Sequence, residues 1–133
     1  MNKFDQNDPL ATLLADDTQA VDRNRLAKLL APYVQFDKET KEISFLSSFN
    51  VISNEAKLEI ALLASKARLL ILGTPEGFSP SELIKMEIMP EGSIKSTIKK
   101  LNDARKVKKD TAGRYIIPNY RMDEIINRFS KGD

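Results

Sequence analysis

Residues 78–118 constrain the fold of this chain more than any other segment, because strong local signals follow one another there. Ser79-Pro80-Ser81-Glu82 combines a serine that can cap a helix, a proline suited to the first helical turn and a glutamate three residues after the serine. This capping box predicts a helix that begins after Ser79. A turn at Met89-Pro90-Glu91-Gly92 then predicts the start of a second helix.

The second helix is predicted over residues 91–105 and has two unlike faces. Ile94, Ile98 and Leu101 are spaced i, i+4 and i+7, which predicts one buried stripe. The complementary face is polar and basic, and no acidic residue occurs between positions 93 and 102. Its members are Ser93, Lys95, Ser96, Lys99, Lys100 and Asn102. Small hydroxyl residues allow a close approach to a nucleic-acid groove, and lysines neutralise phosphates. The other interpretation is an ordinary solvated helix face.

A β-hairpin is predicted directly after this helix. Residues 107–110 and 114–117 read as two short strands joined through Thr111-Ala112-Gly113. Five cations occur within ten residues here, opposed by Asp110. They are Arg105, Lys106, Lys108, Lys109 and Arg114. Lysines on an edge strand can also serve only to prevent aggregation, although fewer would suffice for that.

Apolar spacing and helix-ending residues predict the remaining elements. Short helices are expected at 9–15, where Asp8 can cap, and at 23–31, capped by Asp22. Residues 33–36 and 42–46 alternate in polarity as a hairpin does. The longest helix is expected over 54–72 and is ended by Gly73. The fold class is therefore mainly α with small β-hairpins.

Composition excludes several classes of site. The chain has 133 residues and contains neither cysteine nor histidine, which removes disulfides, thiolate chemistry and the usual metal ligand. No Gly-rich phosphate loop and no recognisable catalytic pair of carboxylates occurs. We therefore expect a protein that is not an enzyme and that uses no metal or cofactor. The polar N-terminus and the short apolar runs predict a cytoplasmic protein without a membrane span.

The charge is unevenly distributed along the chain, although its net value is only +2. Residues 1–90 carry 10 basic and 13 acidic side chains, whereas residues 91–121 carry 9 basic and 3 acidic ones. A basic segment on an acidic body is typical of proteins that bind a polyanion. A solvated lysine-rich surface would give the same count.

Residues 89–98, which read Met-Pro-Glu-Gly-Ser-Ile-Lys-Ser-Thr-Ile, resemble the turn and recognition-helix start of bacterial helix-turn-helix proteins. With the hairpin 107–117, the segment resembles the winged helix-turn-helix superfamily of prokaryotic transcription regulators. The resemblance covers residues 53–118. Outside it, apolar spacing predicts an N-terminal extension over 1–52, with two short helices and a hairpin, and a C-terminal helix over 119–133.

The same resemblance implies duplex DNA binding, with helix 91–105 in the major groove and hairpin 107–117 as the wing. Ser93, Lys95, Ser96 and Lys99 would face the groove, while Lys108, Lys109 and Arg114 would contact phosphates or a minor groove. Lys100 and Lys106 add positive charge beside them. The alternative is a winged-helix module for protein–protein interaction that binds no DNA, since a fold alone does not fix a function.

The ends of the chain are expected to serve assembly. Met122, Ile125, Ile126 and Phe129 share one side of a predicted helix. This side could pair with a second copy in a homodimer that reads a palindrome, or it could pack on its own chain. The N-terminal extension matches no motif and could be a homodimer arm, a docking surface or a covering layer for the long helix.

Overall fold

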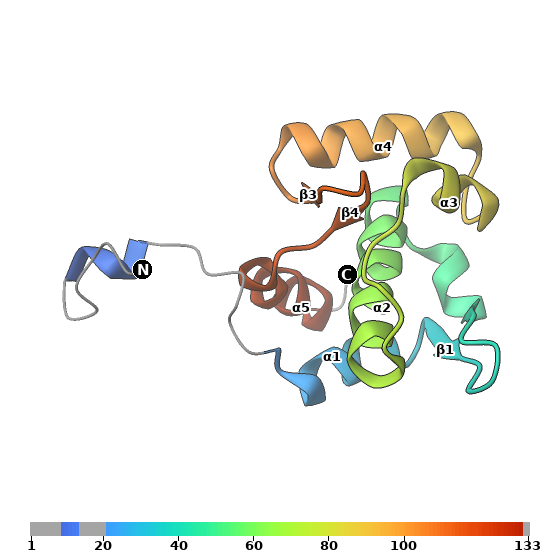
Figure 1. Ribbon diagram of the computed structural model, residues 1–133, viewed down its shortest axis with the longest axis horizontal. Helices are drawn as coiled ribbons and strands as arrows, with labels where there is room; N and C mark the ends of the chain where they lie inside the picture. The colour runs from blue at the N-terminus through green and yellow to red at the C-terminus, as the bar shows by residue number, and fades with distance from the viewer. Residues whose placement is uncertain (1–8, 14–20, 132–133) are drawn as a thin grey trace.

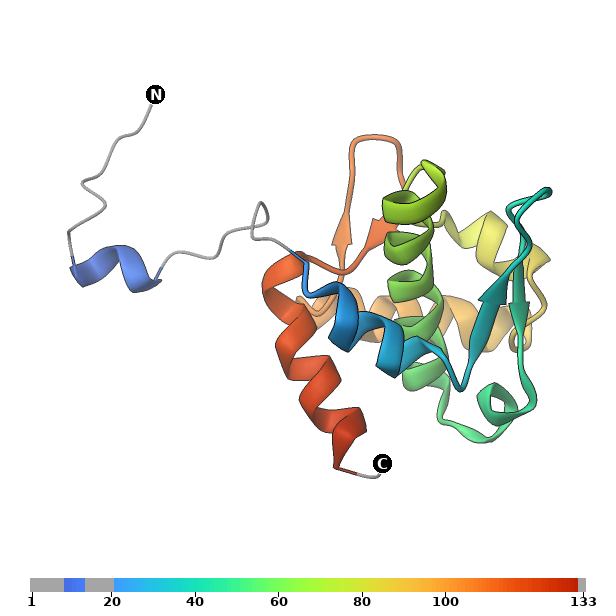
Figure 2. The same cartoon turned by 90° about the horizontal axis from the view of Figure 1, so that it is seen from below.

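The computed structural model describes residues 9–13 and 21–131, and Figures 1 and 2 show their arrangement. The fold is mixed α and β, with mostly helical elements and two small antiparallel hairpins. The helices are η1 (Pro9–Leu13), α1 (Arg23–Leu30), η2 (Ser47–Val51), α2 (Asn54–Leu72), α3 (Pro80–Lys85), α4 (Glu91–Asp103), η3 (Asn119–Arg121) and α5 (Met122–Ser130). The strands are β1 (Val34–Phe36), β2 (Ile43–Phe45), β3 (Lys108–Lys109) and β4 (Tyr115–Ile116).

Helix α2 is the centre of the molecule, and the elements from α1 to α5 surround it (Figure 1). Every residue from Leu58 to Lys66 is buried, so this stretch is covered on all sides rather than along one stripe. The Ser53 hydroxyl accepts from the backbone N–H of Ala56, and Gly73 ends the helix in the left-handed conformation with φ of 74°. Its predicted bounds, 54–72, are confirmed.

The elements before α2 follow the prediction except for η2, which was not predicted. The Asp22 carboxylate caps α1, and Leu26, Leu29 and Leu30 bury the inner face of that helix against α2. Strands β1 and β2 pair antiparallel, with Val34 opposite Phe45. Short helix η1 covers the first part of the predicted helix 9–15, while Asp8 and residues 14–15 lie outside the described residues.

Helices α3 and α4 lie in succession over one end of α2 (Figure 1). The capping box is confirmed, because Ser79 and Glu82 each accept from the other's backbone N–H. Helix α4 ends at Asp103, two residues before the predicted end. Arg105 then adopts a left-handed backbone with φ of 59°, which a continuing helix would not permit.

The second hairpin is shorter than predicted but has a further pairing that the sequence did not indicate. Strands β3 and β4 pair antiparallel, and the hairpin projects beyond the helices (Figure 2). Phe78, just before α3, forms an antiparallel bridge with Tyr115, with N···O distances of 3.2 and 2.8 Å. A third extended segment thus fixes the hairpin to the start of α3.

One hydrophobic core joins the three segments into which the sequence was divided. Leu30 and Phe49 from the N-terminal part, Leu63 and Ile94 from the middle part, and Ile125 from the C-terminal part belong to the same cluster. Helix α5 uses its apolar side within the chain, where Phe129 meets Tyr33 edge-on with ring centroids 5.9 Å apart. Of the two alternatives for this helix, packing on its own chain is the one observed.

No helix among the described residues is both long and apolar enough to cross a lipid bilayer.

Gly77 is expected to be intolerant of a side chain. Its φ is +93°, and an added Cβ would lie 2.8 Å from the carbonyl oxygen of Tyr115 and 2.8 Å from Cγ2 of Ile116. Strain and overlap should make Gly77→Ala lower the free energy of unfolding by roughly 2–4 kcal/mol, measured by urea denaturation.

Gly92 provides the matched control, because it lies in the first turn of α4 with nothing within 4 Å of an added Cβ. Gly92→Ala should leave stability unchanged or raise it by up to about 1 kcal/mol. Equal losses for the two variants would contradict the close approach at Gly77.

Candidate nucleic-acid interface

A strip of polar side chains runs along α4 where it faces the second hairpin. Lys95, Lys99 and Asn102 are spaced i, i+4 and i+7, so they lie above one another on the helix. All three are exposed. The buried residues Ile94, Thr97 and Leu101 hold the inner side of α4 against the core, with the buried Ile98 between that side and the strip, which sets the direction in which the strip faces.

This strip and the hairpin meet in a shallow hollow. The residues that line the hollow are Pro80, Lys95, Ile98, Lys99, Asn102 and Tyr115. On the hairpin, Lys109 lies directly opposite Tyr115, and its Nζ is 5.7 Å from the centre of the tyrosine ring. We call Lys95, Lys99, Asn102, Lys109 and Tyr115 the basic face. The tyrosine ring therefore lies between the lysines of α4 and Lys109 of the hairpin.

Two acidic residues at the ends of α4 pair with the lysines of the basic face. Lys95 Nζ lies 3.0 Å from Glu91, and Lys99 Nζ lies 2.9 Å from Asp103. All four side chains are at least 60% exposed. Exposed i,i+4 pairs of this kind contribute roughly half a kcal/mol or less, so a competing anion can separate them.

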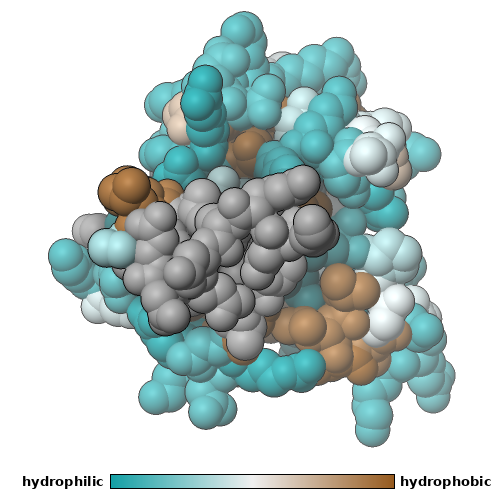
Figure 3. Space-filling model, turned by 60° about the vertical axis from the view of Figure 1, so that its left-hand side comes forward, coloured by the Kyte–Doolittle hydropathy of each residue, from teal (hydrophilic) through white to brown (hydrophobic). Residues whose placement is uncertain are grey.

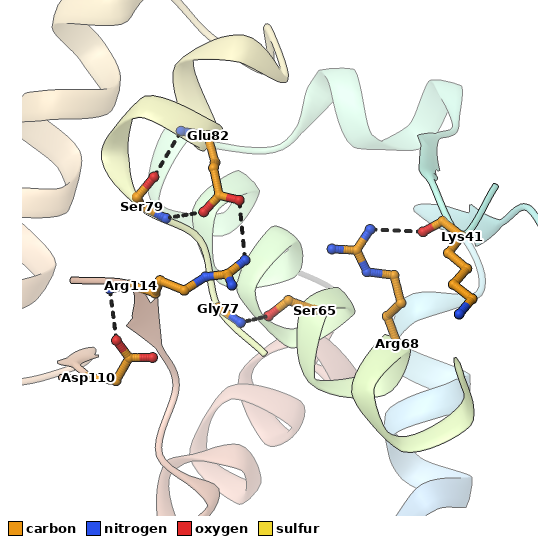
Figure 4. Close-up of polar contacts among 8 residues, drawn as sticks. All are labelled: Lys41, Ser65, Arg68, Gly77, Ser79, Glu82, Asp110 and Arg114. Atoms are coloured by element: carbon orange, nitrogen blue, oxygen red, sulfur yellow. Dashed lines mark hydrogen bonds and ion pairs between the residues drawn. The ribbon is translucent and has the colours of Figure 1, made fainter. Parts of the chain in front are cut away.

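Arg114 takes a different direction from the predicted one and anchors the hairpin (Figure 4). Its guanidinium lies 3.2 Å from Oε2 of Glu82, the same carboxylate that closes the capping box of α3. Asp110 holds the turn of the hairpin by accepting from the backbone N–H groups of Ala112 and Arg114, each at 2.9 Å. Arg114 is therefore half-buried between the hairpin and α3.

Arg68 on α2 lies near the Arg114–Glu82 pair. Its guanidinium donates to the carbonyl oxygen of Lys41 at 2.9 Å and lies over the ring of Phe78, 5.5 Å from the ring centre. Burial, with a smaller effect from the nearby Arg114, lowers the pKa of the Arg68 guanidinium. Arg68 thus ties the first hairpin and the segment before α3 to the central helix.

The remaining predicted residues lie around the basic face or away from it. Ser96 is exposed beside the strip, and its hydroxyl donates to the carbonyl oxygen of the half-buried Ser93. Lys108 is exposed on β3, where strand alternation directs it to the other side of the hairpin from Lys109. Lys100 lies toward the start of α2, with its Nζ 3.4 Å from Glu55.

Lys106 lines a separate cleft between the start of α2 and the end of α5. Apolar residues of this cleft include Val51 and Phe129, and its charged residues include Glu59 and Arg128. The Glu59 side chain is only 4% exposed and pairs with Arg128. Burial raises the pKa of the Glu59 carboxyl, and the attraction of Arg128 offsets only part of that effect.

The structure thus brings together Lys95, Lys99 and Lys109 and separates them from Lys100, Lys106 and Arg114. Sequence reasoning missed the part of Tyr115, which was placed only within the predicted strand 114–117. The signal that could have found it is the isolated Phe78 between Gly77 and the capping box, since an apolar residue there can pair with a neighbouring strand.

The residues described by the structure contain no group of three His, Cys, Asp or Glu side chains that could hold a metal ion. Comparisons with protein families, with curated proteins and with solved structures found no match to this chain.

The raised pKa of Glu59 predicts a pH dependence of stability. Ionising this carboxyl is harder in the folded protein than in the unfolded chain, whose pKa lies near the ordinary value of 4.5. Its contribution to the free energy of unfolding should therefore fall as the pH rises above about 4.5, until the group is ionised in both states.

Glu59→Gln removes this titration, so the two proteins should be unfolded in urea over a series of pH values. As the pH rises above about 4.5, the free energy of unfolding of the wild type should fall relative to that of Glu59→Gln. Once Glu59 is ionised in both the folded and the unfolded state, the difference between the two proteins should be constant. A wild type that gains stability relative to the variant would show that the pair with Arg128 outweighs burial.

Proposed function

We propose that this chain binds duplex DNA as a winged helix-turn-helix protein of the transcription-regulator type. The order α2, the Phe78 bridge, α3, α4 and the β3–β4 hairpin supports this arrangement. In it, α4 enters the major groove, which is wide enough for an α-helix, and the hairpin acts as the wing beside it.

The observation that carries the proposal is the meeting of α4 and the hairpin at Tyr115. Lys95 and Lys99 line the same hollow as Tyr115, and Lys109 lies over its ring. Helix and hairpin cations spaced around one ring can contact successive phosphates of a single duplex. Cations on opposite sides of the molecule could not.

Each residue of the basic face has a defined part in the proposal. Lys95, Lys99 and Lys109 neutralise phosphates, which supplies affinity but no sequence preference. Asn102 and the nearby Ser96 carry the hydrogen-bonding groups that can reach base edges. Arg114 acts indirectly, because its pair with Glu82 holds the hairpin against α3.

Lys99 and Lys109 provide the direct test, because both are exposed and lie on different elements. Lys99→Gln should reduce the magnitude of the slope of log Kd against log salt by about 0.9, the value for one lost phosphate contact, measured with a random-sequence duplex. Lys99→Glu combined with Lys109→Glu should abolish binding, while stability stays within about 1 kcal/mol of the wild type.

Lys38→Glu provides the control for net charge, because Lys38 is exposed in the turn of the first hairpin. It should change binding far less than Lys99→Glu does. Equal effects of Lys38→Glu and Lys99→Glu would contradict a localised interface. Absence of duplex binding by the wild type at low salt would overturn the proposal in favour of a protein-interaction module.

A further inference from the structure

An apolar groove lies on the side of the molecule formed by α1, β1 and the C-terminal end of α2. Its lining includes Leu26, Leu30, Val34, Ala67, Leu70 and Ile71. Ile71 is 60% exposed, although it is one of the most apolar residue types. Figure 3 shows hydrophobic side chains gathered on the lower part of the molecule, at the height of the C-terminal end of α2.

The same chain contains an exposed apolar segment of matching character. In η1, Leu10 and Leu13 are 68% and 79% exposed. Leu10 and Leu13 stand at i and i+3, the spacing that places them on one side of a 3-10 turn. A helical turn with one leucine-rich side is the kind of segment that lies in an apolar groove.

Charge favours the same pairing. Between Lys3 and Arg23 the sequence contains five aspartates and no basic residue, and Asp16 and Asp17 follow the leucines after one alanine. Arg23 is the one charged residue among those that line the groove. The aspartates that flank residues 9–13 would therefore meet a cation and no carboxylate among the residues that line the groove.

We propose that residues 9–13 of a second copy lie in this groove, so that two chains exchange their N-terminal segments. The chain folded by itself leaves Leu10, Leu13 and the groove exposed. Two copies related by a twofold axis fill two grooves at once, and such an exchange closes on itself without further growth. The ten residue steps from Leu13 to Arg23 span up to roughly 33–36 Å when extended, which is enough to reach a neighbouring chain.

Cysteine cross-linking tests this exchange without background, because the natural chain has no cysteine. The variant that carries both Leu13→Cys and Ile71→Cys should form a disulfide-linked species of two chains under mild oxidation, seen on a non-reducing gel. A control that carries Leu13→Cys and Val51→Cys should form far less, since Val51 is 84% exposed but lies outside the groove.

Sedimentation of the cysteine-free protein gives a second measurement. The wild type should be dimeric, and Leu13→Asp should raise the concentration needed for dimerisation by more than about tenfold. A monomeric wild type at high protein concentration would overturn the proposal. A disulfide formed within single chains of the double variant, between positions 13 and 71, would also overturn it, because it would place the segment in the groove of its own chain.

Discussion

The arrangement of the molecule depends on two polar side chains buried in the middle of α2. The Ser65 hydroxyl accepts from the backbone N–H of Gly77 at 2.9 Å (Figure 4), and Lys66 lies 2.7 Å from Glu76 and 2.5 Å from Asn119. Both side chains are almost fully buried, so leaving either without its partners would be costly. One turn of helix therefore holds the chain before α3 and also the chain after the second hairpin. Since Phe78 and Tyr115 lie just inside these two points, their bridge is positioned from both sides.

The basic face depends on this arrangement. Tyr115 can take its place beside Lys95 and Lys99 only if β4 runs alongside Phe78. Arg114 and Glu82 then fix the hairpin from its other end, and the capping box fixes Glu82 itself. The site is thus assembled from rigid contacts between elements, which is the usual condition for placing several charges at defined positions. Little of its geometry depends on the exposed ion pairs of α4.

Local signals predicted the elements well because each had a physical cause within a few residues. Ser53 and Gly73 set the ends of α2, and Ser79 with Glu82 set the start of α3. The end of α4 was predicted two residues late, since nothing local announces the left-handed backbone at Arg105, whose carbonyl oxygen accepts from Arg121 sixteen residues away. The separation of Arg114 and Lys106 from the other cations was likewise invisible, because Arg114 pairs with Glu82 and Lys106 lines a cleft with Glu59, and both carboxylates are remote in sequence. Composition identified the basic region, but only tertiary contacts show which of its cations share one surface and which lie elsewhere.

The carboxylates of Glu91 and Asp103 have a consequence for selectivity. Each of these carboxylates already pairs with a lysine ammonium group that a polyanion would bind. An incoming ligand must therefore displace a carboxylate of the protein at both ends of α4. A flexible, diffusely charged polymer gains little from such an exchange. A stiff ligand whose charges repeat at a fixed interval would contact several lysines at once, and these contacts together would offset the cost of separating each lysine–carboxylate pair. Under the proposed DNA binding, Glu91 and Asp103 would therefore favour polyanions with regularly spaced charges over irregular ones.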